Sequence, residues 1–248
     1  MLSLQNVGLT LETEEAPVRI LDGINIDFEP GKMYALTGPN GSGKSSVAKA
    51  IMGMFTPTEG KIEFQGEDIT NLSITERARR GIGYGFQQPP RFKGLRVIDL
   101  LEVAMEHGNV EECQCLRQIG LCPDTYNERA LDASLSGGEM KRIEIATLLA
   151  QNPKVRIFDE PEAGIDLWSF EQLIDVIQKT HASDRITIVI SHQEKILNMM
   201  DEILMMMEGH IELRGDCQEV WPQIKNLTRC ACRDSCVKEG EIYADCPR

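Results

Sequence analysis

The chain has 248 residues, of which 42% are hydrophobic and 26% are charged, and its formal net charge is -13. This size and composition are those of a globular protein with one large core, and the negative charge argues against a nucleic-acid-binding protein, which normally has a basic face. No apolar run approaches the roughly 20 residues that cross a bilayer, and no signal-peptide pattern opens the chain. We therefore expect a cytoplasmic protein whose eight cysteines are thiols or metal ligands rather than disulfides.

The N-terminal part of the chain predicts two paired strands and a third, buried strand. Alternating apolar residues predict strands over 2–11 and 18–28, separated by an acidic turn at 12–17. A turn at 29–31 then leads into a short apolar run over 33–37, which predicts a buried strand.

A glycine-rich loop follows this strand. Residues 38–45 are Gly-Pro-Asn-Gly-Ser-Gly-Lys-Ser, the G-x-x-x-x-G-K-S pattern of a phosphate-binding P-loop, and a helix is expected over 46–54. In such a loop the glycines and the helix N-terminus form an anion-binding nest, Lys44 reaches the β- and γ-phosphates, and Ser45 binds Mg²⁺. A chance glycine-rich turn is the alternative, but the order of strand, loop and helix favours a site for ATP or a close relative. The predicted nucleotide-binding residues are Gly38, Asn40, Gly41, Ser42, Gly43, Lys44, Ser45 and Ser46.

The middle of the chain predicts an inserted helical subdomain. A break at 57–60 precedes a short strand over 61–64, and a further strand within 81–90 runs into a loop that ends at two prolines. From 97 to about 132 the spacing of apolar residues is helical, so we expect a helical subdomain over about 88–136.

A Leu-Ser-Gly-Gly-Glu stretch at 135–139 precedes an amphipathic helix expected over 138–150. Ser136 and Glu139 have the spacing of a capping box, which is one explanation for this stretch. A capped helix N-terminus preceded by glycines can also bind a γ-phosphate. Both explanations can hold together.

Two acids, Asp159 and Glu160, end a strand predicted over 155–158. After a P-loop, such a pair is predicted to hold Mg²⁺ through water and to polarise the attacking water, respectively, although two acids after an apolar strand can also be mere surface residues. A helix over 166–179 and a strand over 186–190 follow, and then strands near 203–207 and 210–213.

Three further residues complete the pattern. Asp166 ends an Ala-Gly-Ile-Asp stretch and could also cap the following helix, and His192 follows the strand that ends at residue 190. Gln87 lies in the loop after the strand within 81–90.

The kinds and order of these motifs resemble those of ATP-binding cassette (ABC) ATPases over about residues 2–215. The resemblance implies an α/β fold, namely a P-loop ABC-type nucleotide-binding domain with an antiparallel β subdomain and an inserted α-helical subdomain. It implies ATP and Mg²⁺ as ligands. One departure is that residues 1–27 contain no aromatic side chain to stack on adenine, so an aliphatic contact from Val18 or Leu11 is expected instead.

The same resemblance implies roles for individual residues. The implied catalytic residues are Glu160, His192 and Gln87. The implied Mg²⁺ ligands are Ser45, Gln87 and Asp159. Ser136, Gly138 and Asp166 would contribute to nucleotide binding, with Ser136 facing Lys44 of a second copy in an ATP-dependent head-to-tail homodimer.

Three stretches, within 35–45, 86–101 and 136–142, resemble the SufC-type ATPases of SUF iron–sulfur cluster assembly more closely than transporter subunits. That resemblance implies a SufB- or SufD-like scaffold protein as partner, docked near residues 88–98 and distorted when the ATP-bound dimer closes. The ATP-binding subunit of a membrane ABC transporter, with the same chemistry and a different partner, is the alternative.

The last residues differ in character from the rest of the chain. We expect an ATPase domain over 1–227 and a cysteine-rich tail over 228–248. The spacing C-x-C-x₃-C-x₉-C could hold Zn²⁺ or an iron–sulfur cluster, which gives a third hypothesis, a metal- or cluster-binding protein. A flexible tail with free thiols explains the pattern equally well. The possible ligands are Cys230, Cys232, Cys236 and Cys246.

Overall fold

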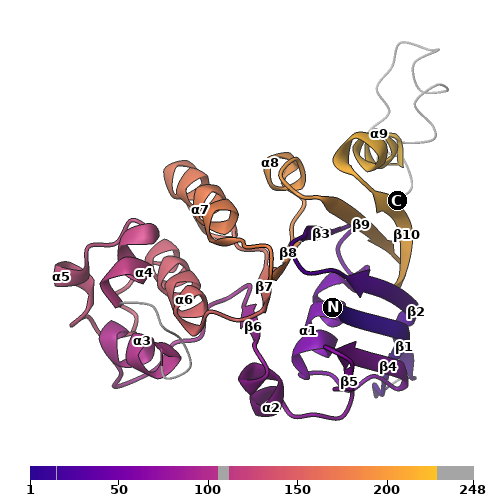
Figure 1. Cartoon of the computed structure of the whole chain (residues 1–248), viewed down its shortest axis with the longest axis horizontal. Coiled ribbons are helices and arrows are strands. Elements are labelled where there is room, and N and C mark those ends of the chain that lie inside the picture. The colour runs from indigo at the N-terminus through magenta and orange to yellow at the C-terminus, as the bar shows by residue number, and fades with distance from the viewer. Residues whose placement is uncertain (15, 106–111, 228–248) are drawn as a thin grey trace.

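The computed structural model describes residues 1–14, 16–105 and 112–227. Within these residues, helices and strands alternate along most of the chain (Figure 1). The strands are β1 (Leu2–Leu11), β2 (Val18–Phe28), β3 (Met33–Thr37), β4 (Glu59–Phe64), β5 (Glu67–Asp68), β6 (Ile82–Gly85), β7 (Val155–Asp159), β8 (Ile186–Ile190), β9 (Glu202–Met207) and β10 (His210–Gly215). The helices are α1 (Lys44–Met52), α2 (Ile74–Arg79), α3 (Val97–Met105), α4 (Glu112–Gln118), α5 (Pro123–Tyr126), α6 (Gly137–Gln151), α7 (Leu167–Thr180), α8 (Glu194–Leu197) and α9 (Cys217–Leu227).

The strands form two sheets. One is antiparallel, in the order β2-β1-β4-β5, and the other has the order β10-β9-β3-β8-β7-β6. In the second sheet the neighbours from β9 to β6 are parallel, and only β10 pairs antiparallel. Every residue of β3, β7 and β8 is buried, as expected for parallel strands that are covered on both faces.

The parallel register brings three loops to one edge of the sheet. Ile190, the last residue of β8, pairs with Leu36 of β3 on one side and with Asp159 of β7 on the other. The chain therefore leaves β3, β7 and β8 side by side at their carboxyl ends, which is where ligands bind in open α/β sheets.

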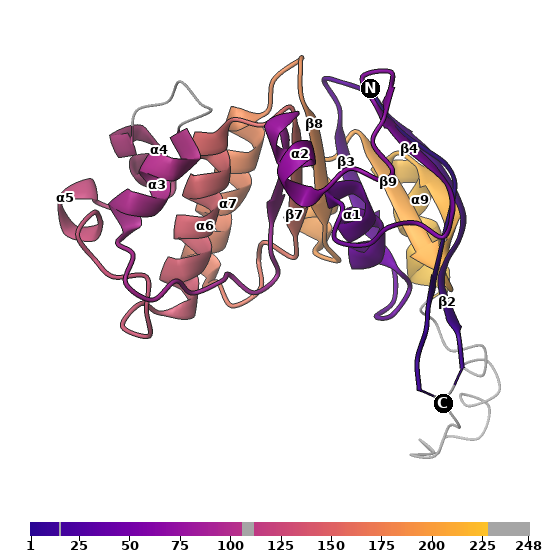
Figure 2. The same cartoon turned by 90° about the horizontal axis from the view of Figure 1, so that it is seen from below.

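Alternate side chains of the central strands face two different cores. In β3, Tyr34 and Leu36 pack with α1 and the antiparallel sheet, whereas Met33 and Ala35 pack with α6, α7 and α8. Helix α1 therefore lies between the two sheets, and α6 and α7 cover the opposite face of the central sheet (Figures 1 and 2). This alternation is the physical result of the two-residue period of a strand.

Most predicted elements are present, with shifted ends. The expected helical stretch from 97 to about 132 is divided into α3, α4 and α5, because Gly120 turns the chain with φ +72° and Pro123 begins a new helix. Three helices were not predicted, namely α2, the short α8 and α9. Helix α2 begins at a capping box formed by Ser73 and Glu76, and α9 packs against β9 and β10. In the described part of the chain, none of the helices has the length and apolar character needed to cross a bilayer.

Candidate functional site

The glycine-rich loop joins β3 to α1 and depends on glycine backbone conformations. Gly38 has φ +136°, and a Cβ atom at this position would lie 2.1 Å from the carbonyl oxygen of Met206. Gly43 caps α1 with φ +101°. Gly41 also has positive φ, but an added Cβ atom there would meet nothing within 4 Å, so this face of the loop is open. Only glycine satisfies these constraints at low cost.

The Lys44 side chain folds back over the loop. Its Nζ donates to the carbonyl oxygens of Gly38 and Pro39, at 2.9 and 2.7 Å. Burial lowers the pKa of Lys44, while the nearby carboxylates of Glu160 and Asp159 act in the opposite direction. The Ser42 hydroxyl is buried and, among the described residues, has no hydrogen-bond partner. A buried cation, an unsatisfied hydroxyl and an open loop face fit a site for an anionic ligand.

Two of the three predicted Mg²⁺ ligands, Ser45 and Asp159, meet at the end of β7. Ser45 Oγ donates to Asp159 Oδ1 at 3.0 Å, although the two residues are 114 positions apart in the chain. The other carboxylate oxygen, Oδ2, accepts a 2.6 Å hydrogen bond from the Tyr84 hydroxyl. Hydroxyl and carboxylate oxygens are the ligand types that Mg²⁺ prefers, so the residues present fit this metal.

Tyr84 was not predicted as a site residue. It lies on β6, next to β7, and its hydroxyl is buried against the Asp159 carboxylate. Burial, and then the hydrogen bond to this carboxylate, raise the pKa of Tyr84 well above its ordinary value. The hydroxyl is therefore protonated at neutral pH and can donate to Asp159.

Gln87 and Glu160 are in direct contact. Gln87 Nε2 donates to Glu160 Oε2 at 2.6 Å, which places Gln87 beside the carboxylate that sequence analysis predicts as the base. The Glu160 backbone has φ +45°, and its N–H donates to the carbonyl oxygen of Ile190 at 3.0 Å. A non-glycine residue in this left-handed region is uncommon, and such residues cluster at functional sites.

His192 follows the adjacent strand at the same edge of the sheet. It comes two residues after Ile190 and its side chain is exposed, whereas Ser191 is buried and donates through Oγ to Glu162. The structure therefore gathers the P-loop, Asp159, Glu160 and His192 at one edge, as the order of motifs predicts.

Three predicted residues lie in a second group. Ser136 caps α6 by accepting from the Glu139 N–H at 3.2 Å, and Glu139 accepts in return from the Ser136 N–H at 2.8 Å. The pKa of Glu139 is lowered to about 2, first by the Tyr126 hydroxyl and then by Ser136, so this capping box persists over a wide pH range. Asp166 caps α7 by accepting from the backbone and hydroxyl of Ser169.

This second group is separate from the P-loop of its own chain. A Cβ atom on Gly138 would lie 3.6 Å from the carbonyl oxygen of Gly164, so the start of α6 is close to the loop that leads to Asp166. Helices α6 and α1 pack on opposite faces of the central sheet (Figure 1). Within the described residues, the polar partners of Ser136 belong to its own helix. The P-loop and the Ser136 group are thus carried by helices on opposite faces of the central sheet.

Val18 and Leu11, the residues expected to contact the base, pair with each other at the end of the β1–β2 hairpin, and the Val18 residue is 44% exposed. Nearby along β2, the Leu21 side chain lies 2.9 Å from an ideal Cβ on Gly43. Strand β2 therefore runs beside the P-loop, and the side chain that approaches the loop there, Leu21, is fully buried.

The possible tail ligands Cys230, Cys232, Cys236 and Cys246 lie outside the described residues, as does the predicted tail over 228–248. In the part of the chain that is described, no three His, Cys, Asp or Glu side chains gather as a metal site.

Comparison with known proteins gives consistent results. The family model described as "ABC transporter" matches residues 21–163. The chain is 37% identical to the uncharacterized ABC transporter ATP-binding protein MJ0035 of Methanocaldococcus jannaschii, over 81% of this chain and 84% of that protein. It is 31% identical to a probable ABC transporter ATP-binding protein of Streptococcus pyogenes serotype M3, over 87% of this chain and 89% of the relative.

Solved structures resemble this fold over most of its length. The dimeric ATP-binding cassette MJ0796, in a post-hydrolysis state with ADP and Pi, has a TM-score of 0.78 and 25% identity, and covers 87% of this chain and 98% of its own. A bacterial Atm1-family ABC exporter with ATP bound has a TM-score of 0.77 at 25% identity, with 90% of this chain and 40% of the exporter covered.

Proposed function

The chain belongs to the ABC transporter family and hydrolyses ATP, and from this premise we propose that it does so between two copies arranged head to tail. The separation of Ser136 from the P-loop of its own chain carries this proposal, because a site that needs both groups requires a second chain. The dimeric cassette that resembles this fold supports the formation of a dimer.

We propose the following roles within each composite site. The loop from Gly38 to Ser46 and the Lys44 amine bind the phosphates, and Ser136 of the second copy binds the γ-phosphate from the other side. Ser45, Asp159 and Gln87 would hold Mg²⁺, which would supply positive charge against the charge that develops on the phosphates. Glu160 accepts a proton from the attacking water, which Gln87 and His192 help to orient.

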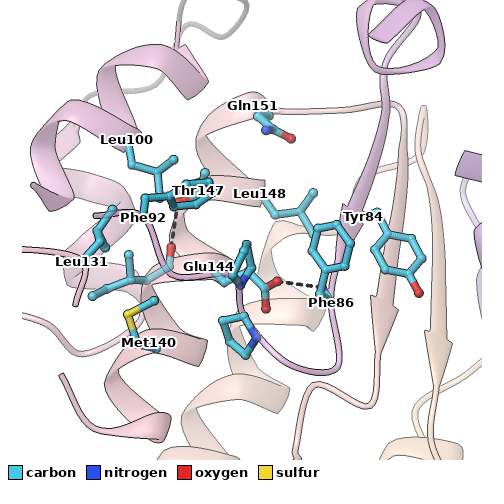
Figure 3. Close-up of a pocket in the computed structure, with 13 residues that line it drawn as sticks. Tyr84, Phe86, Phe92, Leu100, Leu131, Met140, Glu144, Thr147, Leu148 and Gln151 are labelled. Carbon is cyan, nitrogen blue, oxygen red and sulfur yellow. Dashed lines mark hydrogen bonds between the residues drawn. The ribbon is translucent and has the colours of Figure 1, made fainter. Parts of the chain in front are cut away.

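The partner that the ATPase moves is a separate proposal. The names of the relatives favour the ATP-binding subunit of a membrane transporter, whose partner is a membrane-spanning protein. The region predicted to dock a partner borders a cavity of about 170 Å³, lined in part by Pro89, Pro90 and Phe92 (Figure 3). Phe86, Phe92 and Leu95 are 38%, 38% and 40% exposed, so this face offers apolar contact area.

A SufB- or SufD-like scaffold in iron–sulfur cluster assembly is the second candidate partner. Its support is the sequence itself, in the stretches within 35–45, 86–101 and 136–142 that resemble SufC-type ATPases. The chemistry at the ATP site is the same in both cases, so the site does not discriminate between them.

Anaerobic affinity purification of the chain from its native cells separates the two candidates. Recovery of a membrane-spanning permease supports the transporter subunit. Recovery of a SufB-like protein together with iron and sulfide supports the assembly ATPase instead.

The Phe92→Glu variant should lose either partner, since it places a charge on the apolar docking face, and retention of the partner would contradict the docking site.

We propose the cysteine tail as a Zn²⁺ or iron–sulfur site. Metal and sulfide analysis of the anaerobically purified chain tests this directly. A chain without residues 228–248 serves as the control, and equal metal content in the full-length and the shortened chain would contradict the proposal.

Removing the Tyr84 hydroxyl is predicted to weaken Mg²⁺ binding. Tyr84→Phe deletes one of the two hydrogen bonds that orient Asp159, and loss of such a supporting contact costs metal affinity by about 10-fold or more. We expect a corresponding rise in the Mn²⁺ dissociation constant, measured by electron paramagnetic resonance with bound ADP. Tyr126→Phe is the matched control, because its hydroxyl donates to Glu139 rather than to Asp159. An unchanged Mn²⁺ constant for Tyr84→Phe would contradict the role.

A further inference from the structure

A buried ion pair lies on the inner face of α6. Lys141 and Glu144 are one helical turn apart, with Lys141 Nζ 3.2 Å from Glu144 Oε2, and their side chains are only 2% and 11% exposed. Burial raises the pKa of Glu144, and the Lys141 charge opposes this rise. The pair is thus held away from water on a helix that otherwise packs into the apolar core.

Both members of the pair also bind the backbone of one residue, Phe86. Glu144 Oε1 accepts a 2.7 Å hydrogen bond from the Phe86 N–H (Figure 3). Lys141 Nζ donates to the Phe86 carbonyl oxygen, and it lies 3.5 Å from the Gln87 carbonyl oxygen. The ion pair therefore fixes the backbone just after β6, where the chain leaves the sheet.

Stability alone does not account for this arrangement. Removing two charges from water is costly, and buried ion pairs can often be replaced by apolar side chains of similar size without loss of stability. What the apolar replacements cannot do is hold the two backbone groups of Phe86. The distinctive property of this pair is therefore the position that it gives to the following residue, Gln87.

Gln87 links the ion pair to the predicted catalytic residues. Its Nε2 donates to Glu160 Oε2 at 2.6 Å, so a shift of the Phe86 backbone moves the amide that faces the predicted base. Helix α6 begins just after Ser136, the predicted contact to the ATP of a second copy, and Lys141 lies little more than one turn from this cap. The middle of α6 lines the cavity at the proposed docking face, through Met140, Ile143 and Glu144 (Figure 3).

We propose that Lys141 and Glu144 are positioning residues that hold Gln87 against Glu160 and thereby tie the position of α6 to ATP hydrolysis. ATP bound at Ser136, or a partner bound in the cavity, would then move α6. This movement would shift the Phe86 backbone and so change the position of the Gln87 amide relative to Glu160. This inference rests on the roles proposed above for Gln87 and Glu160.

The test replaces the pair with apolar side chains of similar volume, Lys141→Met with Glu144→Leu. Because a misplacement of about 1 Å at a reacting group costs about 100-fold in rate, we expect kcat to fall by about that factor. KM for ATP and Tm should stay close to those of the parent protein. A purely structural role would instead lower Tm and leave kcat of the folded protein unchanged.

Two controls accompany the double variant. Glu144→Gln keeps an oxygen acceptor for the Phe86 N–H and should retain most of kcat. The exposed pair Asp175 and Lys179 on α7 is also one turn apart, so Asp175→Asn with Lys179→Gln controls for the loss of a helical ion pair and should not change kcat.

A parent-like kcat in the folded Lys141→Met, Glu144→Leu variant would overturn the proposal. If that variant does not fold, amide hydrogen exchange of the parent protein tests the proposal instead. The Phe86 amide should then exchange as slowly as the core amides of α6, and exchange as fast as that of an exposed loop would overturn the proposal. Glu160→Gln separates this inference from the role proposed for Glu160. Normal turnover of Glu160→Gln would contradict the assignment of Glu160 as the base, whereas an inactive Glu160→Gln with a fully active double variant would contradict only the positioning role.

Discussion

Glu160→Gln is expected to lower ATP turnover by about 10²- to 10⁴-fold, the usual contribution of a general base, while ATP still binds. Glutamine has nearly the same shape as glutamate and keeps a polar group beside Gln87, but it cannot accept a proton from water. The binding groups, Lys44 and Ser45, are unchanged by this substitution. Binding without hydrolysis should then hold two copies together around ATP.

Two measurements check this result. Steady-state phosphate release gives the loss of turnover, and gel filtration with Mg²⁺ and ATP should reveal a stable dimer that the parent protein forms only transiently. Glu212→Gln, at an exposed position on β10, is the matched control for the loss of one carboxylate and should behave as the parent. Turnover at the parental rate would mean that Glu160 is not the base.

Sequence reasoning predicted the residues that share a motif. The contact between Ser45 and Asp159 spans 114 positions, but it follows from two motifs that each end a buried strand of one parallel sheet. Sequence analysis assigned Gln87 and Glu160 to one catalytic site without predicting their contact, which arises because β6 and β7 are neighbouring parallel strands. The shared sites are predictable because each motif specifies both a local backbone shape and the edge of the sheet at which it lies.

Other features depend on tertiary contacts that no local pattern encodes. Tyr84 looks like any apolar strand residue until β7 places Asp159 opposite its hydroxyl. Lys141 and Glu144 have the spacing of an ordinary surface pair on a helix, and only the return of the chain at Phe86 buries them. Helix α9 was missed although Val220, Trp221 and Ile224 have helical spacing, because Pro222 lies inside this short span and predicts a break.

The head-to-tail arrangement makes a second strong prediction, that two inactive variants restore each other. Lys44→Ala removes the phosphate-binding cation, and Ser136→Arg blocks the γ-phosphate side of the partner's site, so each variant alone should show almost no turnover. In a mixed dimer, both defects fall in one composite site and the other site is intact. With random pairing, about one quarter of the composite sites are intact, since a two-fold dimer has two equivalent interfaces.

The deciding readout is ATP retained by the protein, because turnover could need both sites of a dimer to be intact. Each variant is therefore made together with Glu160→Gln, and bound nucleotide is measured after rapid gel filtration. The mixture should retain ATP in a dimer, whereas each variant alone should retain almost none. If Ser136 instead acted only as the cap of α6, its replacement would impair the helix of its own chain and no partner could supply the missing contact. Mixing would then restore nothing, and the structural separation of Ser136 from its own P-loop would have no catalytic meaning.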